Sequence, residues 1–283
     1  MKAYAKINIG LRIIKKRDDG FHDIETIFYP VSLSDEINVS ATPTTKDFNS
    51  VIIKTNRSYI SADRTNTCYK IIEQFFKEFQ IRDKFKIEIL IKKSIPVGGG
   101  LGGGSSDAAS VLKYLVKYFN IDVSSNKEKV MNIALTVGSD IPFFLICKPC
   151  YATGKGEILK VLPYFKIKNK ILLVTPNLHI SSKWAYESLN IQHEYTSAPA
   201  LAGVKNIDVN DMEKFVNDFE KPVFEKYTEI KKVKSEMIRR GALFSSLSGS
   251  GATVYGIFPE TSRKQIYDTY YFFKSKQFFV YIS

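Results

Sequence analysis

The sequence has few of the residues that build disulfide frameworks, metal sites or membrane spans. Its 283 residues include only three cysteines and three histidines. No apolar run approaches the roughly 20 residues that a membrane helix needs. The first residues, MKAYAKINIGLRIIKK, interrupt their apolar positions with lysine, asparagine and arginine, which is not typical of a signal peptide. We therefore expect a cytoplasmic protein with no membrane partner.

The cysteine pair Cys147 and Cys150 forms a C-K-P-C string that superficially resembles a redox or zinc motif. A zinc site would need about two further ligands, and the chain offers one more cysteine and three distant histidines. A thioredoxin-like dithiol would follow a strand and open a helix, whereas this pair follows the apolar run IPFFLI. We expect reduced thiols that are buried or partly buried.

The chain also lacks any block of about five or more like charges, although its formal net charge is +12. Lysine and arginine are spread along its length, and the aromatic–basic pattern of an RNA-recognition motif is absent. A basic charge suits either a nucleic-acid binder or an enzyme that acts on anionic small molecules. Solvated faces account for most of these lysines, and we expect no nucleic-acid partner.

Length and hydrophobic patterning predict an α+β protein of about two domains. A stretch with proline and lysine near residues 162–170 places the boundary, giving domains at 1–163 and 164–283. Alternating apolar residues predict strands, and apolar residues at helical spacing predict helices. We expect antiparallel sheets in both halves. The predicted strands lie at 3–11, from the turn at 19–20 to about 54 with a polar loop near 41–49, at 84–93, from 170 onward, and at 241–247, 253–258 and 278–282. The predicted helices lie at 65–79, 108–119, 127–137, 183–189, 212–219 and 227–240.

The most informative stretch is IPVGGGLGGGSSDAAS, at residues 95–110, which follows an alternating strand and leads into an apolar helix stripe. Glycine permits positive φ and allows several N–H groups to converge. The N–H groups and dipole at a helix N-terminus favour an anion, and Ser105 and Ser106 add hydroxyl donors at the cap. The stretch therefore predicts a phosphate-binding loop, with a mobile glycine-rich hinge as the alternative.

Three common phosphate loops do not match this stretch. A Walker A loop ends in Gly-Lys-Ser/Thr, and this stretch has no lysine. The glycines Gly98, Gly100 and Gly103 spell G-x-G-x-x-G. A Rossmann loop, however, follows a fully buried parallel strand, whereas the strand before this stretch alternates apolar and polar residues. A protein kinase would need H-R-D and D-F-G, and the sequence contains neither.

The string P-V-G-G-G-L-G-G-G-S-S-D-A-A resembles the ATP loop of the GHMP kinases. Its triple-glycine form is similar to that of the GHMP kinases that act on 4-diphosphocytidyl-2-C-methyl-D-erythritol, in the non-mevalonate route to isoprenoid precursors. Further segments resemble that family in the same order: AKINIGL, GFH, TVGSDIPFF, HISSKWAY and SLSGSGATVYG. The resemblance implies a two-domain GHMP kinase fold with a ribosomal-protein-like N-terminal domain and a ferredoxin-like C-terminal domain.

The resemblance also implies site residues. It makes Lys6 and Asp140 catalytic, and it places Phe21 and Tyr186 on opposite faces of a cytosine. The other substrate-binding residues it implies are Asn8, His22 and Ser182. The residues it assigns to ATP are Asn66, Lys93, Pro96, Val97, Gly98, Gly99, Gly100, Leu101, Gly102, Gly103, Gly104, Ser105 and Ser106. Mg²⁺ would bridge the β- and γ-phosphates. Asp107, Cys147 and Cys150 lie beside these segments without an assigned role.

Taken alone, several of these residues allow simpler interpretations. Lys6 and Asn8 share one face of a strand, and that face could be solvated. Asp140 stands two residues before a proline, as a helix N-cap does. Phe21 with His22 could be ordinary packing, and the Ser-Gly-Ser-Gly string could be a plain turn.

The implied reaction is transfer of the γ-phosphoryl group of ATP to the 2-hydroxyl of the cytidyl substrate. The partners are then small molecules, and the enzyme is a monomer or a homodimer. One alternative is another GHMP kinase, acting on homoserine, mevalonate or a sugar. A second alternative is an RNA-binding protein on a ribosomal-protein-like fold, whose affinity would fall steeply with salt.

Overall fold

The structure, a computed structural model, describes residues 1–46, 49–189, 201 and 215–283. The chain forms two compact units, and each unit is assembled from separated segments. The first comprises Met1–Ala5, Leu33–Ile95 and Gly102–Cys147, and the second comprises Lys6–Ser32, Pro96–Leu101 and Lys148–Ser283. Strands β1 (Lys2–Lys16) and β2 (His22–Pro43) therefore run through both units. The boundary expected near residue 163 stays a prediction.

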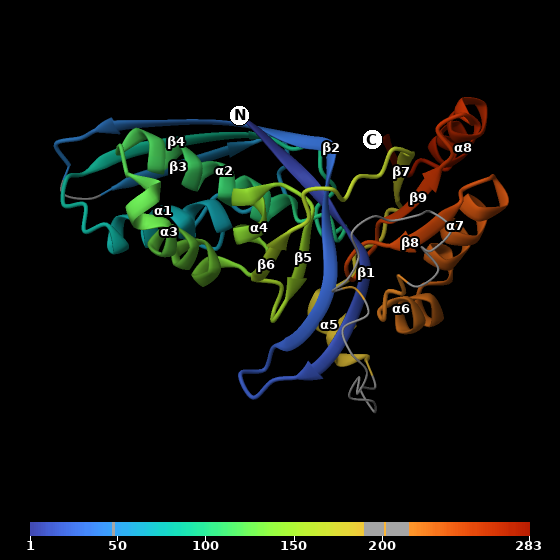
Figure 1. Cartoon of the computed structure of the whole chain (residues 1–283). Coiled ribbons are helices and arrows are strands. Elements are labelled where there is room, and N and C mark those ends of the chain that lie inside the picture. Colours follow the sequence, from blue (N-terminus) through green and yellow to red (C-terminus); the bar gives the residue numbers. More distant parts are fainter. Residues whose placement is uncertain (47–48, 190–200, 202–214) are drawn as a thin grey trace. The chain divides into compact units, whose positions relative to one another are not determined.

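The first unit combines a sheet with four helices. Strand β4 (Phe85–Lys92) pairs antiparallel with β2 and parallel with β3 (Ser50–Thr55). Figure 1 shows the helices gathered on one side of β3 and β4. The parallel pair corrects the expectation of purely antiparallel sheets, because side-chain alternation does not reveal the direction of a neighbouring strand. The helices are α1 (Thr67–Glu78), α2 (Gly103–Tyr118), α3 (Val123–Val137) and α4 (Ile141–Ile146).

Local sequence explains why β4 and α1 form. In β4, Phe85, Ile87, Ile89 and Ile91 are buried, and they alternate with residues that are exposed or half-buried. In α1, the buried residues fall on one helical face, and the side chain of Asn66 caps the first turn. Both elements match their predicted positions, with α1 two residues shorter at its N-terminus than expected.

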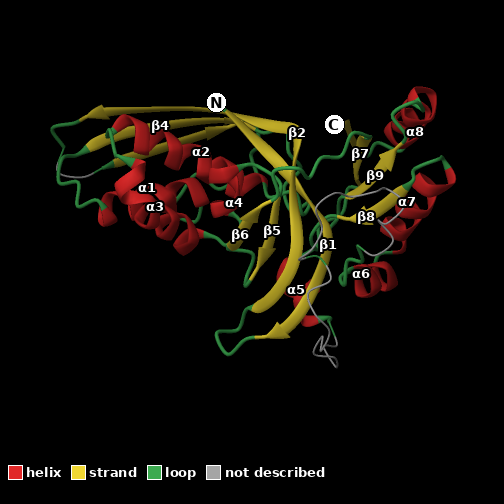
Figure 2. Cartoon of the chain, in the orientation of Figure 1, coloured by secondary structure: helices red, strands yellow, loops and turns green. Residues whose placement is uncertain are grey.

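The second unit contains an antiparallel sheet in the order β10-β7-β9-β8. Its strands are β7 (Lys170–Thr175), β8 (Phe244–Leu247), β9 (Val254–Phe258) and β10 (Phe279–Ile282). Figure 2 shows α7 (Thr228–Arg239) and α8 (Arg263–Ser275) beside this sheet. The unit also contains α5 (Ser182–Glu187), α6 (Glu220–Lys226) and the antiparallel strands β5 (Cys150–Thr153) and β6 (Ile158–Val161).

The core of the second unit draws on both ends of the sequence. Leu11 and Ile13 from β1, with Ile24 from β2, are buried in one cluster with residues of the β7–β10 sheet and the helices that cover it. A backbone link supports this packing, because the Leu11 N–H donates to the carbonyl of Val216 at 2.9 Å. The first strands are therefore part of the C-terminal core.

Several predicted elements differ from those observed. Helix α3 ends at Gly138 as expected, but this glycine has a φ of −177° and so does not adopt the left-handed cap conformation. Of the helix expected at 212–219, residues 212–214 lie outside the described residues, and residues 215–219 are not helical, because α6 begins only at Glu220. Helices α4 and α8 were not predicted. No described helix is both long and apolar enough to cross a membrane.

The cysteines match their prediction. Cys68 and Cys150 are buried free thiols, and Cys147 is a half-buried free thiol. Burial raises the pKa of the Cys68 thiol, and it also raises that of Cys147. Raised values keep both thiols protonated and poorly nucleophilic at neutral pH.

Candidate active site

We call residues Pro96–Ser106 the glycine loop and residues Ser248–Ala252 the serine–glycine turn. The first part of the glycine loop belongs to the second unit, where it packs against the serine–glycine turn. Gly100 has a φ of +74°, and a Cβ added there would lie 2.0 Å from the carbonyl oxygen of Ser248. The Ser248 hydroxyl donates to the Gly100 carbonyl at 3.0 Å. Two glycine-rich segments that lie about 150 residues apart in the sequence thus form one backbone cradle.

The glycine loop ends in the first unit as the N-terminus of α2. Gly102, with a φ of +70°, is the N-cap, so a glycine occupies the position where serines were expected. Ser106 is buried and its N–H closes the first helical turn by donating to the Gly102 carbonyl at 2.9 Å. The N–H groups of Gly103, Gly104 and Ser105 have no intrahelical acceptor, which is the arrangement that attracts an anion.

Lys6 and Asn8 lie together on β1 within the second unit. Both are buried, at 5% and 2% exposure, so the solvated-face interpretation is wrong. The Lys6 ammonium donates to the Asn8 side-chain oxygen at 2.6 Å and lies 4.8 Å from the ring centre of Phe28. The Lys6 N–H donates to the carbonyl of Leu101 at 3.0 Å, which places this strand beside the glycine loop.

Asp140 lies in the first unit immediately before α4, as TVGSDIPFF predicts. Within the described chain its side chain makes no capping hydrogen bond, although Pro142 occupies the first turn. Asp140 thus occupies the N-cap position, as the alternative interpretation expects, but its side chain does not make the hydrogen bond of a cap. Asp140 and Lys6 belong to different units, and their catalytic pairing stays a prediction.

Among the aromatic residues expected at the cytosine, His22 and Tyr186 contact each other, and the placement of Phe21 and Tyr186 on opposite faces of a base stays a prediction. The ring of His22 stacks on that of Tyr186 with centres 4.7 Å apart and planes at 18°. Phe21 is 55% exposed, and the Lys155 ammonium lies 4.7 Å from its ring centre. Phe21 and His22 are neighbours at the start of β2, where successive side chains point to opposite sides. Burial lowers the pKa of His22, and the Lys16 charge adds to this, so the stacked imidazole is neutral at pH 7.

Ser182 connects the segment HISSKWAY to the serine–glycine turn. Its hydroxyl lies 3.1 Å from that of Ser250, within hydrogen-bond distance. Ser182 is the first residue of α5, and Ser181 caps that helix by accepting from the N–H of Trp184. The predicted substrate residue Ser182 and the second glycine turn are thus neighbours in the second unit.

Asn66 and Lys93 have structural partners that the sequence did not reveal. The Asn66 side chain accepts from the Cys68 N–H at 2.8 Å and donates to the Ser61 carbonyl at 2.6 Å. The Lys93 ammonium is buried and donates to the carboxylates of Asp35 and Asp107. Both side chains are thus already hydrogen-bonded to protein groups, which does not leave them available as donors to a nucleotide.

Comparison with known proteins identifies the family. The sequence profile of the GHMP kinases N terminal domain matches residues 66–148, and that of the GHMP kinases C terminal matches residues 200–273. The chain is 37% identical over 260 residues to a 4-diphosphocytidyl-2-C-methyl-D-erythritol kinase of Azobacteroides pseudotrichonymphae genomovar. CFP2, covering 92% of this chain and 93% of that protein. The chain belongs to the 4-diphosphocytidyl-2-C-methyl-D-erythritol kinases, a family of GHMP kinases.

Two further similarities extend over the whole length of this GHMP kinase. A 4-diphosphocytidyl-2-C-methyl-D-erythritol kinase of Clostridium novyi (strain NT) is 36% identical over 286 residues, covering 100% of this chain and 98% of that protein. A crystal structure of 4-(cytidine 5'-diphospho)-2C-methyl-D-erythritol kinase superposes with a TM-score of 0.74 at 27% identity, covering 100% of this chain and 97% of the other. The α+β, two-sheet GHMP kinase fold expected from the glycine loop is therefore confirmed.

Two further residues, which the sequence did not predict, shape the cradle of this GHMP kinase. Asn217 is buried, and its side-chain amide donates to the carbonyls of Leu247 and Gly249 at 2.8 and 2.9 Å. A Cβ added at Gly98 would lie 2.4 Å from Nδ1 of His179, so the imidazole covers the glycine loop. His179 opens the quoted segment HISSKWAY, whereas the sequence around Asn217 gives no signal.

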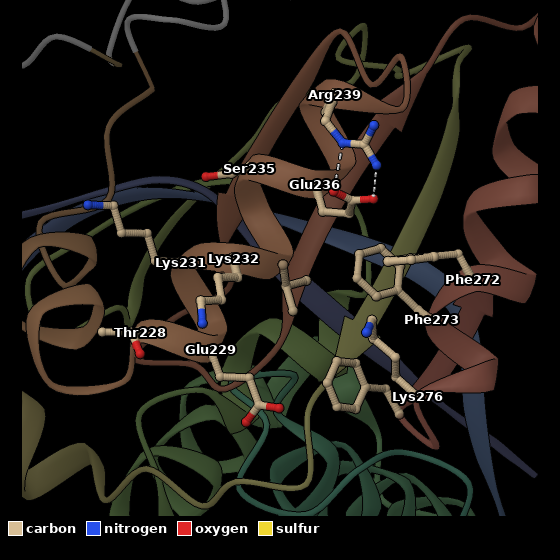
Figure 3. A pocket seen from close by; sticks show the side chains of 12 residues that line it. Thr228, Glu229, Lys231, Lys232, Ser235, Glu236, Arg239, Phe272, Phe273 and Lys276 are labelled. Carbon is tan, nitrogen blue, oxygen red and sulfur yellow. Dashed lines mark hydrogen bonds and ion pairs between the residues drawn. The ribbon is translucent and has the colours of Figure 1, made fainter.

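A separate cavity of about 760 Å³ opens between α7 and the end of α8. Figure 3 shows Phe272 and Phe273 on one wall, Lys232 and Lys276 on opposite sides, and Arg239 paired with Glu236. The predicted site residues do not line this cavity. It is therefore distinct from the cradle formed by the glycine loop and the serine–glycine turn.

Metal-ligating residues do not cluster in the part of the chain that the structure describes. Across residues 1–46, 49–189, 201 and 215–283, no group of three or more His, Cys, Asp or Glu side chains could hold a metal ion. The described residues thus supply a backbone cradle for an anion, and they do not supply a carboxylate cage for a cation.

Proposed function

We propose that this GHMP kinase transfers the γ-phosphoryl group of ATP to the 2-hydroxyl of 4-diphosphocytidyl-2-C-methyl-D-erythritol, in the non-mevalonate route to isoprenoid precursors. The observation that carries this assignment is the 36% identity to a kinase of that substrate across 100% of this chain. The structure contributes the cradle in which the glycine loop packs against the serine–glycine turn. Such a cradle suits the triphosphate of a nucleotide.

The glycine loop is proposed to bind the ATP phosphates through its backbone. Positive φ at Gly98, Gly100 and Gly102 turns the loop, and the first N–H groups of α2 face outward without helical acceptors. A Cβ at Gly98 or Gly100 would occupy space that the loop needs for this packing. Mg²⁺ would be held mainly through the phosphate oxygens of the nucleotide, because Mg²⁺ at such sites usually takes only one or two protein carboxylates.

Lys6 and Asp140 are proposed as the catalytic pair. Phosphoryl transfer requires mainly alignment and charge stabilisation, with one residue to accept the proton of the attacking hydroxyl. Asp140 would accept that proton. Lys6, which Asn8 orients through a 2.6 Å hydrogen bond, would hold the hydroxyl and offset negative charge near the γ-phosphate.

His22, Tyr186 and Phe21 are proposed to bind the cytidine end of the substrate, with Asn8 and Ser182 as polar contacts. Every nucleobase has two π faces that an aromatic ring can stack on. The stack of His22 on Tyr186, with ring centres 4.7 Å apart, occupies the space that a base would need between them. We infer that substrate binding separates these two rings, or uses the exposed ring of Phe21 on the outer side.

The remaining proposals concern the capture of the substrates, the location and the oligomeric state. Both are polyanions, and the net charge of +12 favours their capture. We propose small molecules as the partners, a cytoplasmic location and a monomeric or homodimeric state. Asn66 and Lys93 are proposed to support the nucleotide site indirectly, because their side chains are engaged with protein groups.

The test is a coupled assay of ADP release with ATP, Mg²⁺ and the cytidyl substrate, run beside homoserine and mevalonate. We expect turnover with the cytidyl substrate only. The variant Asp140→Asn should lower kcat by about 100- to 10,000-fold, the usual contribution of a general base. The control Asp122→Asn changes an exposed N-cap of α3 and should leave kcat unchanged, because asparagine caps as well as aspartate does.

Two results would overturn parts of this proposal. Turnover with homoserine or mevalonate, and none with the cytidyl substrate, would retain the GHMP kinase chemistry and remove the substrate assignment. Normal kcat in a folded Asp140→Asn variant would remove Asp140 as the base while leaving the substrate assignment in place.

A further inference from the structure

A buried group of three charged side chains connects the two ends of the glycine loop within the first unit. Lys93 donates to a carboxylate oxygen of Asp35, and to Asp107 at 2.8 Å. All three side chains are nearly inaccessible to solvent, at 5% exposure or less. We call these residues the buried triad, and the activity proposed above uses none of them directly.

The buried triad contacts the chain on both sides of the loop. On the incoming side, the second carboxylate oxygen of Asp35 accepts from the N–H groups of Ser94 and Ile95 at 2.6 and 2.8 Å. On the outgoing side, a Cβ at Gly103 would lie 3.1 Å from the Lys93 ammonium. Lys93 therefore lies against the point where the loop becomes α2, and Asp107 anchors it one turn further along the helix.

The two carboxylates of the buried triad are not equally satisfied. Asp35 accepts hydrogen bonds at both oxygens. Asp107 accepts one bond at Oδ2, while its buried Oδ1 has no hydrogen-bond partner among the described residues. A buried carboxylate oxygen without a donor is costly in the ionised state. With both acids ionised, the buried triad also carries one uncompensated negative charge beneath a site for phosphates.

We propose that Asp107 is a positioning residue that holds the glycine loop in its nucleotide-binding form as the neutral acid, and that its ionisation weakens the binding of nucleotide phosphates. This inference rests on the ATP role of the glycine loop proposed above. The phosphates and the ionised Asp107 carry like charges on the two sides of the first turn of α2. By linkage, binding of the nucleotide must then favour uptake of a proton by Asp107.

Three titratable groups of the described chain act on Asp107: Lys93, Asp35 from β2 and Cys68 from α1. Desolvation by burial is the largest influence and raises the pKa of Asp107 to about 7, with Asp35 adding to it and Lys93 opposing it. Burial lowers the pKa of Lys93, but the two carboxylates outweigh it and the net shift is upward, so the ammonium stays charged. Asp107 is therefore the member whose charge changes near neutral pH.

The test compares the wild type with Asp107→Asn, an isosteric neutral side chain. The dissociation constant for Mg²⁺–ATP is measured by calorimetry at several pH values from about 6 to about 9, on either side of the Asp107 titration. In the wild type we expect Kd to rise with pH, by up to about tenfold for each unit by which the nucleotide shifts the Asp107 equilibrium. In Asp107→Asn we expect this rise to be lost. Any titration of the nucleotide itself affects both proteins equally.

A second readout does not depend on the nucleotide. Because the pKa of Asp107 is raised in the folded state, its contribution to stability is complete in acid and is lost as pH rises through about 7. Relative to Asp107→Asn, the free energy of unfolding of the wild type should fall between the unfolded-state pKa of about 4 and the folded-state pKa of about 7, and should be level above that. The matched control Asp122→Asn should follow the wild type in both measurements, because Asp122 is exposed and its pKa lies at about 2.

The outcomes separate this inference from the proposed function. The same rise of Kd with pH in the wild type and in Asp107→Asn would overturn the inference and leave ATP binding intact. No binding of Mg²⁺–ATP by the wild type at any pH would instead remove the proposed function. If Asp107→Asn does not fold, the proton uptake of the wild type on binding Mg²⁺–ATP tests the inference instead. It is measured by calorimetry at about pH 8 in two buffers of different ionisation enthalpy. Net proton uptake on binding would support the inference, and its absence would overturn it.

Discussion

Adding a single methyl group at Gly100 should be enough to disrupt the glycine loop. At Gly100, a Cβ would lie 2.0 Å from the Ser248 carbonyl oxygen and 3.1 Å from that of Gly251, with φ at +74°. The left-handed conformation alone costs an L-residue about 1–2 kcal/mol, and forcing a group into filled space costs about 1–3 kcal/mol more. We predict that Gly100→Ala loses both stability and affinity for ATP, as measured by thermal unfolding and by calorimetric titration.

Gly20→Ala is the matched control for that substitution. Gly20 also has a positive φ, at +81°, but a Cβ there would meet nothing within 4 Å. The free energy of unfolding of this variant should fall only by the conformational cost of about 1–2 kcal/mol, and its ATP affinity should not change. If Gly100→Ala and Gly20→Ala were equally stable and bound ATP equally well, the contact between the loop and the serine–glycine turn would be unimportant.

Individual residues of the site were predictable to different degrees. Alternation along β1 placed Lys6 and Asn8 on one face, but it could not show that this face is buried, because burial depends on Phe28 and on the glycine loop. The resemblance named Phe21 as the partner of Tyr186, whereas the structure stacks His22 there. No sequence pattern pointed to Asp35, whose role depends on a contact with residues about 60 positions further along the chain.

At the scale of elements, the serine–glycine turn depends on a side chain from outside its own hairpin. The buried amide of Asn217 donates to the carbonyls of Leu247 and Gly249, and its oxygen accepts from the Phe219 N–H at 3.0 Å. Leaving a buried polar group unsatisfied costs about 1–3 kcal/mol. We predict that Asn217→Ala destabilises the protein by about that amount or more and weakens ATP binding, because the turn no longer supports the glycine loop.

Chemical unfolding and ATP titration of Asn217→Ala would measure both effects. Asn177→Ala is the matched control: Asn177 is exposed and its amide donates to the Gln277 carbonyl at 3.2 Å. Water can replace that partner, so this variant should stay within about 0.5 kcal/mol of the wild type. Equal losses in the two variants would show that the turn does not need Asn217.

Elements with strong local patterns were predicted well, and those that depend on distant contacts were not. The alternation in β4 and the capped apolar face of α1 identify both elements from a few consecutive residues. The parallel pairing of β3 with β4 is a non-local property. In α8, Ile266 and Phe273 are buried, but Tyr267 and Tyr271 are 52% and 66% exposed, so the aromatic residues do not form a clean helical stripe.

For the whole molecule, a domain boundary near residue 163 would imply that residues 164–283 fold independently. The sheet β10-β7-β9-β8 lies entirely beyond that boundary. Its core cluster nevertheless contains Leu11, Ile13 and Ile24, each at most 6% exposed. Burying one such side chain contributes about 1.5–3 kcal/mol. Together the three approach the total stability of a typical domain, about 5–15 kcal/mol.

A fragment of residues 164–283 should therefore fail to fold on its own. Besides the three apolar side chains, it would lose the backbone hydrogen bonds that Leu11 makes with Val216 and Asp218, at 2.9 and 2.8 Å. We predict no cooperative thermal transition by circular dichroism for the fragment alone, and a cooperative transition for the intact chain. Co-expression with residues 1–163 should restore the transition, because that fragment carries β1 and β2, which supply Leu11, Ile13 and Ile24. A cooperative transition of 164–283 alone, near the midpoint of the intact chain, would instead make the boundary a true division between independent domains and would reduce the contribution of β1 to that of a peripheral strand.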